Sequence, residues 1–152
     1  MLSLDLQLQR GGFQRHVRIE EEARVVAIAG RSGAGKTTVL NAIAGLVRPQ
    51  AGHIRIDDRV LYDSARGIDL PPHRRRIGYV FQDARLFPHL DVRQNLRYGR
   101  HGDAQASFGF EAMVDLLGIA GLLARRTANL SGGEAQRVAI GRALLSQPAI
   151  LL

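Results

Sequence analysis

Leucines alternate with polar residues at the start of the chain. Positions 2, 4, 6 and 8 are leucine, and the positions between them are polar or charged. This two-residue period is typical of a strand that buries one face. A second short strand is predicted around residues 17–19, after a Gly-Gly turn at residues 11–12. The N-terminal region is therefore expected to form antiparallel strands.

A short apolar run follows at residues 24–29. It is rich in valine and alanine and stops at a glycine, which predicts a buried central strand. Beyond a glycine-rich loop, apolar residues recur at helical spacing through residues 37–46, with Gly45 and Pro49 near the end. The order predicted here is strand, glycine-rich loop, helix.

The rest of the chain continues to alternate strands and helices. A hairpin turn is expected at Asp57 and Asp58, and Asp91 and Ser131 are each placed to cap a helix. The other predicted elements are strands at residues 53–56, 59–61, 76–81 and 149–152, helices up to residue 97 and at 110–117, 120–124 and 132–145, and a polar loop at 99–107. This alternation predicts an α/β fold.

Composition narrows the classes of function. The chain of 152 residues has the length of one domain, is 45% apolar and has no cysteine. The absence of cysteine excludes disulfides and thiolate metal sites. The five histidines are scattered without metal-ligand spacing, so no zinc site is expected. No apolar stretch approaches the ~20 residues that span a bilayer, so membrane association is expected only through a partner.

The net charge of +7 leaves two interpretations open. A basic chain can bind nucleic acid, or it can carry an arginine-biased surface near anionic lipid or nucleotide. The arginines are spread along the chain without an aromatic platform or zinc-finger spacing, so no direct nucleic-acid partner is expected. The densest basic run, residues 73–76, is interpreted as a solvated loop entering a strand.

Lysine is used once in this chain, against 20 arginines. The single lysine, Lys36, completes a G-x-x-x-x-G-K-[ST] pattern. Glycine loops of this kind turn backbone N–H groups toward an anion, and the following helix adds the positive end of its dipole. Lys36 is expected to reach the β- and γ-phosphates, and Thr37 to be a Mg²⁺ ligand. The predicted nucleotide-binding residues are Gly30, Arg31, Ser32, Gly33, Ala34, Gly35, Lys36, Thr37 and Thr38.

The glycine-rich loop alone does not identify the class of protein. A tight turn without a ligand is one alternative, and kinases, GTPases, helicases and transport ATPases share the pattern. A second glycine-rich turn, at residues 130–137, reads Leu-Ser-Gly-Gly-Glu-Ala-Gln-Arg. It resembles the signature motif of ATP-binding-cassette (ABC) ATPases. Taken without the first loop, it is equally an ordinary serine-capped helix start.

The resemblance to ABC ATPases implies a fold and an assembly. The fold is an α/β P-loop NTPase core with N-terminal antiparallel strands and a helical signature subdomain. The core is expected at residues 1–82, the helical subdomain at 83–130, and the signature helix with the start of the Walker B strand at 131–152. The assembly is a head-to-tail homodimer, in which each signature contacts the ATP of the partner subunit. The residues expected to make this contact are Ser131, Gly132, Gly133 and Gln136.

The same resemblance gives Gln82 a role. Gln82 follows the predicted strand at residues 76–81 and matches the Q-loop glutamine of the family. It is expected to act in catalysis, where its amide binds Mg²⁺ or orients water, and the segment after it is expected to contact the membrane subunit. The alternative is an exposed loop residue.

Several phrases look most like the ATPase subunit of bacterial molybdate importers. They lie at residues 32–41, 46–50, 78–90 and 95–99. Sulfate, iron and sugar importers have similar cassettes. The resemblance implies ATP and Mg²⁺ as ligands, a membrane permease as partner, and a peripheral location on the cytoplasmic face of the bacterial inner membrane.

The chain stops where the family places its next motifs. An aspartate that holds magnesium, a glutamate that polarises water and a switch histidine are expected after the strand at residues 149–152, and none follows Leu152. We therefore expect a truncated cassette that keeps part of its ATP site and lacks the hydrolytic groups. A soluble ABC ATPase acting on DNA or ribosomes, and a non-functional cassette fragment, are the alternatives.

Overall fold

The computed structural model describes residues 1–10, 13–99 and 109–152. They form two compact units, Met1–Arg75 and Arg76–Leu152. The turn predicted at residues 11–12 and nearly all of the loop predicted at 99–107 lie outside the described residues. No helix in the described ranges has the length and apolar character needed to cross a membrane.

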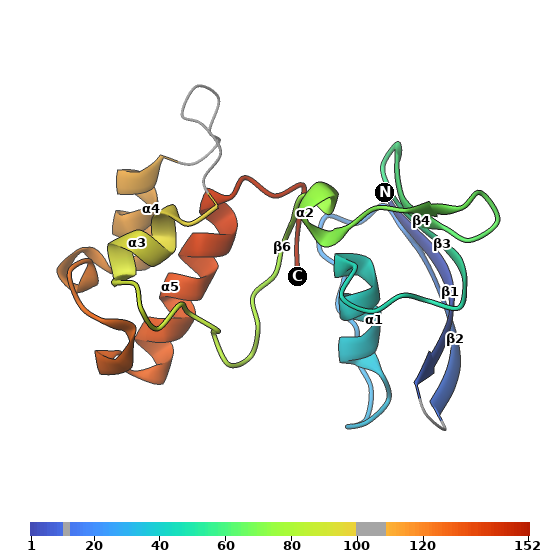
Figure 1. The fold of residues 1–152 in the computed structure, drawn as a ribbon, viewed down its shortest axis with the longest axis horizontal. Coiled ribbons are helices and arrows are strands. Elements are labelled where there is room, and N and C mark those ends of the chain that lie inside the picture. The colour runs from blue at the N-terminus through green and yellow to red at the C-terminus, as the bar shows by residue number, and fades with distance from the viewer. Residues whose placement is uncertain (11–12, 100–108) are drawn as a thin grey trace. The chain divides into compact units, whose positions relative to one another are not determined.

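An antiparallel sheet is the base of the first unit. Its strand order is β2-β1-β3-β4-β5 (Figure 1). The alternating leucines of β1 place Leu4, Leu6 and Leu8 in the core, as predicted. The predicted hairpins, one N-terminal and one around Asp57 and Asp58, are confirmed by the pairing of β1 with β2 and of β3 with β4. The strands are β1 (Leu2–Arg10), β2 (Phe13–Glu21), β3 (Ala51–Ile56), β4 (Arg59–Asp63) and β5 (Ile68–Asp69).

One helix, α1 (Lys36–Ala44), covers a face of this sheet (Figure 1). It confirms the helix predicted at residues 37–46, and it buries Val39, Ala42 and Ile43. It ends at Gly45, whose φ of 79° lies in the left-handed region that favours glycine. A second helix of this unit, α2 (Pro72–Arg75), was not predicted, because the basic run at residues 73–76 was interpreted as a loop.

The buried central strand predicted at residues 24–29 is wrong. These residues form no strand, and Val25 and Val26 are 86% and 38% exposed. A central strand needs a hydrogen-bonded neighbour on each side. Among the described strands, the sheet of the first unit contains β1 to β5 only, so the apolar run has no ladder to join within its own unit.

Helices dominate the second unit. The cap residues Asp91 and Ser131 begin α3 and α5 as predicted, and the helices predicted at residues 110–117 and 132–145 are confirmed with the same bounds. The helix predicted at 120–124 is a shorter 3₁₀ turn. The elements are α3 (Val92–Arg97), α4 (Phe110–Leu117), the 3₁₀ turns η1 (Ala120–Leu122) and η2 (Thr127–Asn129), and α5 (Gly132–Leu145).

These helices share one apolar core. Buried side chains from α3, α4, η1 and α5 meet there, among them Leu96, Met113, Leu122 and Val138. Gly141 is the point of closest approach, because a Cβ there would lie 2.8 Å from side-chain atoms of both Leu96 and Leu117.

Two short parallel strands complete the second unit. They are β6 (Ile77–Gly78) and β7 (Ile150–Leu151), and both are shorter than the strands predicted at residues 76–81 and 149–152. The backbone ladder extends beyond them, because Ala149 N donates to Arg76 O and Val80 N donates to Leu152 O, each at 2.8 Å. The two predicted strands are thus confirmed over a shorter length, and the structure pairs them in parallel.

Candidate functional site

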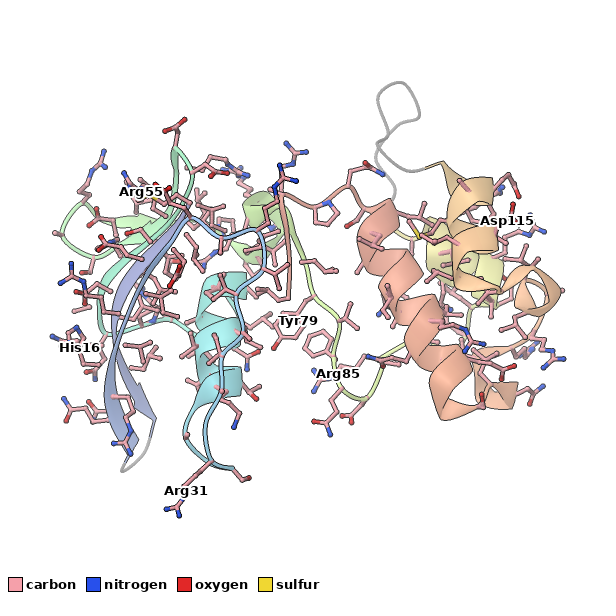
Figure 2. All side chains as sticks on the ribbon, turned by 180° about the vertical axis from the view of Figure 1, so that it is seen from behind. His16, Arg31, Arg55, Tyr79, Arg85 and Asp115 are labelled. Atoms are coloured by element: carbon pink, nitrogen blue, oxygen red, sulfur yellow. The ribbon has the colours of Figure 1, made fainter. Side chains whose placement is uncertain are left out.

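The glycine-rich loop leads directly into α1. Gly33 and Gly35 have φ values of 77° and 93°, which are energetically unfavourable for residues that have a Cβ. A hydrogen bond from Ala34 N to Arg31 O, at 3.2 Å, closes a turn within the loop. Arg31 extends away from the loop into solvent (Figure 2). A Cβ at Gly33 would have no neighbour within 4 Å, so the space beside this glycine is open to a ligand.

Lys36 folds back over this loop. Its Nζ donates to Gly30 O at 2.7 Å and to Arg31 O at 2.8 Å. An ammonium group has three N–H donors, so one remains beyond these two contacts. The half-buried stem and the two carbonyl contacts hold the charge beside the loop.

The first turn of α1 offers backbone donors. Its N-cap, Gly35, has no side chain to accept from them, and no carboxylate occupies the first turn. The N–H groups at a helix start carry the positive end of the helix dipole. Together with Lys36, they fit the charge and donor needs of a phosphate chain. The exposed Thr37 and the partly buried Thr38 add hydroxyl groups to the same turn, and a hydroxyl oxygen is a ligand that Mg²⁺ accepts.

A buried arginine closes the other end of α1. Arg75 is 1% exposed, and its Nη1 donates to Ala42 O at 2.8 Å and to Ile43 O at 2.9 Å. These are carbonyls of the last helical turn, where the helix dipole is negative. The guanidinium also donates from Nε to Leu70 O at 2.7 Å and from Nη2 to Asp69 Oδ1 at 3.0 Å. Arg75 therefore fixes the C-terminus of the helix whose N-terminus forms the loop site.

The interpretation of residues 73–76 as a solvated loop is wrong for Arg75. Burial lowers the pKa of Arg75 from its ordinary value, and the charge of Asp69 opposes this effect. Arginine titrates so high that the group keeps its charge. The neighbouring Arg74 and Arg76 are exposed. Sequence alone did not distinguish the buried arginine from its two exposed neighbours, because only the tertiary contacts with α1 bury Arg75.

Gln82 lies on a turn of the second unit and is exposed. The next residues have unusual backbone angles, since Ala84 and Arg85 are non-glycine residues with φ values of 56° and 45°. Such angles persist where the surroundings hold them. The fully buried Asn95 helps to stabilise this loop. Its side chain accepts a hydrogen bond from Phe87 N at 2.8 Å and donates one to Phe87 O at 3.1 Å.

The second glycine-rich turn begins α5. Ser131 Oγ accepts from Glu134 N at 3.3 Å, while Glu134 Oε2 accepts from Ser131 N at 2.7 Å. This reciprocal pair is a capping box. The hydrogen bonds from Ser131 lower the pKa of Glu134 below its ordinary value. A Cβ at Gly132 would meet nothing within 4 Å.

The signature turn therefore presents an open, exposed surface. Ser131, Gly132 and Gly133 are exposed, and Gln136 is partly buried on the same helix. The Ser131 hydroxyl accepts within its own capping box, which leaves its O–H to donate elsewhere. The structure thus brings the residues of 30–38 together in the first unit, and Gln82 and the signature residues belong to the second.

Comparison with known proteins identifies the family. The family model described as "ABC transporter" matches residues 16–152. The chain belongs to the ABC transporter family. It is 56% identical to the "Molybdenum import ATP-binding protein ModC" of Rhodospirillum rubrum, over all of this chain and 42% of that protein. The ModC of Brucella melitensis is 53% identical over 99% of this chain and 42% of its own length. The chain thus spans less than half the length of these curated relatives.

Solved ABC cassettes share the fold. One is the dimeric cassette MJ0796 in a post-hydrolysis state bound to ADP and Pi, with a TM-score of 0.75 and 29% identity over 99% of this chain and 72% of that chain. Another is the ATP-binding subunit of an ABC transporter, with a TM-score of 0.76 and 26% identity over 99% of this chain and 64% of that chain. The α/β cassette fold expected from the two glycine-rich turns is thereby confirmed.

Three side chains that hold the ABC motifs were not singled out from the sequence. They are Arg75 behind α1, and Asn95 and Arg142 behind the loop after Gln82. Asn95 sits one turn after the cap Asp91, and Arg142 is spaced 11 positions after Ser131 on α5. Asn95 and Arg142 are polar residues on otherwise apolar helix faces, and this pattern is the sequence signal that points to them.

Proposed function

We propose that this chain is the nucleotide-binding part of the ATPase subunit of a bacterial molybdate importer. The observation that carries the proposal is the pairing of Lys36 with an uncapped helix start, where Nζ lies 2.7 Å from Gly30 O beside the free donors of α1. Membership of the ABC family and the molybdenum-import names of its relatives supply the substrate class.

The residues of the first loop are proposed to hold ATP. Backbone N–H groups of residues 30–38 would donate to phosphate oxygens, and Lys36 would balance the β- and γ-phosphate charge. Thr37 and Gln82 are proposed as the Mg²⁺ ligands of this chain. When bound, Mg²⁺ supplies neutralisation of phosphate charge. Gln82 is further proposed to act in catalysis through its amide.

The signature turn is proposed to complete the site of a second copy. Ser131, Gly132, Gly133 and Gln136 would face the γ-phosphate held by the partner subunit in a head-to-tail dimer. The exposed hydroxyl and glycines of this turn support the proposal. The subdivision into a core at residues 1–82, a helical part at 83–130 and a signature part at 131–152 belongs to the same proposal.

The transport partner is proposed to be an integral membrane permease. The chain would then lie peripherally on the cytoplasmic face of the inner membrane. In such an importer ATP binding would close the dimer and hydrolysis, which needs groups beyond those of this chain, would reopen it. The loop after Gln82 is the proposed contact with the permease. No direct contact with nucleic acid is proposed.

Calorimetric titration with Mg-ATP tests nucleotide binding. We expect saturable binding by the chain and at least about tenfold weaker binding by Lys36→Ala, because a charge-assisted contact is lost. Arg66→Ala, which removes the same charge from an exposed position of the first unit, should bind as the parent does. Equal affinity of all three proteins would contradict the proposal.

Co-purification tests the transport class. A tagged chain co-expressed with the permease of a molybdate importer should retain that permease, and it should retain the permease of a sulfate importer less. Salt-sensitive retention of nucleic acid instead would favour a soluble ABC ATPase. A thermal melt unchanged by Mg-ATP would favour a fragment without function.

A further inference from the structure

The loop after Gln82 stores backbone strain. Two consecutive residues, Ala84 and Arg85, take left-handed angles without being glycine. Such angles are unfavourable for any residue that has a Cβ. Their own short turn contributes two local backbone bonds, from Ala84 N to Phe81 O at 3.1 Å and from Arg85 N to Asp83 O at 2.5 Å. Both bonds lie within the turn, so they do not fix its position relative to the helices. Contacts from outside the loop must hold this conformation.

One arginine on the signature helix supplies such contacts. Arg142 Nη2 donates to Arg85 O at 2.9 Å and to Ala84 O at 3.3 Å. These are the carbonyls of the two strained residues. The guanidinium also lies over the Phe87 ring, with Cζ 5.0 Å from the ring centroid. Arg142 therefore contacts the loop both through its backbone and through an aromatic side chain.

Asn95 links Arg142 to the remainder of the loop. Its Oδ1 accepts from Arg142 Nη1 at 3.5 Å and from Phe87 N at 2.8 Å. Its Nδ2 donates to Leu90 O at 3.3 Å and to Asp91 O at 2.9 Å. The segment from residue 84 to 91 is thus bound by one side chain from α3 and one from α5.

The chemistry of these contacts requires a guanidinium. A planar fork can donate to two carbonyls, donate to an amide oxygen and stack on a ring at once, whereas an ammonium cannot. Burial lowers the pKa of Arg142 from its ordinary value. Its hydrogen bonds go to the two loop carbonyls and to the Asn95 amide oxygen. Its charge therefore interacts with the backbone carbonyl dipoles of the loop.

The same helix carries the signature turn at its other end. Ser131 is the N-cap of α5, and Arg142 lies 11 residues further along. At a rise of 1.5 Å per residue the two are separated by roughly 16 Å along one helix. Gly141 and Val138 pack this helix on α3 and α4, so it moves with the rest of the helical core.

We propose that Arg142 is a positioning residue that ties the loop after Gln82 to the signature helix. Its hydrogen bonds to Ala84 and Arg85 make the place of Gln82 depend on the place of Ser131. The functional meaning of this link rests on the proposed roles of Gln82 and Ser131. Arg142 itself would touch neither nucleotide nor metal.

A distance measurement between two spin labels tests the link without nucleotide. The chain has no cysteine, so Gln82→Cys together with Ser131→Cys provides the only two thiols. We expect a narrow distance distribution in the parent and a broader, shifted one after Arg142→Lys. Arg93→Lys, on an exposed position of α3, is the matched control and should leave the distribution narrow.

Hydrogen exchange separates positioning from general stability. Amides of residues 84–87, 89 and 90 should exchange about tenfold faster in Arg142→Lys, since hydrogen bonds to a charged group are lost. Amides of α4 and of the β6–β7 ladder should keep their rates. If Arg142→Lys does not fold, Phe87→Leu removes the ring under the guanidinium and serves in both measurements.

The outcomes decide the inference independently of nucleotide binding. An unchanged distance distribution in Arg142→Lys, or faster exchange spread evenly over α3, α4 and α5, would overturn it. A parent chain that binds no Mg-ATP would instead overturn the proposed function, while the spin-label distances would still decide the role of Arg142.

Discussion

Arg75 is a charged side chain in the interior of the first unit. Its four hydrogen-bond acceptors are three backbone carbonyls and one carboxylate. Removing the Arg75 guanidinium leaves these buried acceptors without hydrogen-bond donors. The free energy lost in this way exceeds the net stabilisation that the intact contacts provide. Asp69 also contacts Arg48, at 3.4 Å, but this exposed contact cannot replace Arg75 inside the unit.

Substitution of Arg75 is therefore expected to destabilise the protein. We predict that Arg75→Met lowers the free energy of unfolding by about 3–5 kcal/mol. The exposed neighbour Arg74 provides a matched control, and Arg74→Met should change stability by no more than about 0.5 kcal/mol. Urea denaturation followed by circular dichroism measures both. Similar losses in the two variants would show that Arg75 does not hold α1.

Glu134 gives the signature turn a pH dependence. Because the pKa of Glu134 is lowered in the folded state by the Ser131 hydrogen bonds, its contribution to stability is complete above the ordinary glutamate value of ~4.3. It is lost as the pH falls below that value and through the lowered folded pKa.

A glutamine at this position keeps the capping box and removes the titration. We predict that the midpoint of thermal unfolding falls less between pH 6 and pH 3 in Glu134→Gln than in the parent, a window that brackets ~4.3. Parallel melts of both proteins at several pH values make the measurement. An identical pH profile would mean that the capping carboxylate does not contribute.

At the scale of elements, the two ends of α1 differ. Its start is uncapped and faces the glycine-rich loop, and its end is closed by Gly45 and Arg75. A Cβ at Gly45 would lie 2.7 Å from Arg75 Nε, so glycine is required there for space as well as for its φ. The helix that carries Lys36 at its start is thus held in place by contacts at its C-terminus.

Two C-cap glycines allow the effect of side-chain crowding to be distinguished from the effect of the backbone angle. Gly45 and Gly118 have left-handed φ values of 79° and 61°, but only Gly45 has a neighbour in the way of a Cβ. Gly118→Ala should cost about 1 kcal/mol for the backbone angle alone. Gly45→Ala should cost roughly 2–4 kcal/mol, because overpacking against Arg75 is added. Equal losses in urea titrations would contradict a tight fit at Gly45.

Local signals explain which elements were predictable. The bounds of α5 and the start of α3 followed from Ser131 and Asp91, whose caps depend on neighbouring residues only. The strand predicted at residues 24–29 failed because pairing depends on strands that are distant in the sequence. The burial of Arg75 was missed for the same reason, since its acceptors at residues 42 and 43 precede it by more than 30 positions.

At the scale of the whole molecule, the two glycine-rich turns identified the family. The ABC transporter match and the cassette folds confirm that inference. The side chains that support the motifs, Arg75, Asn95 and Arg142, were found only in the structure. A motif can be recognised from local spacing, whereas its support comes from residues that tertiary packing brings together.

The single lysine allows a direct test of whether the glycine-rich loop binds a nucleotide. The chain has two amines, Lys36 Nζ and the N-terminal amine of Met1, which pairs with Asp57. An amine-reactive reagent should label both, and Met1 serves as the internal control. We predict that Mg-ATP slows the labelling of Lys36 and leaves that of Met1 unchanged. Equal labelling of Lys36 with and without Mg-ATP would contradict nucleotide binding by this loop.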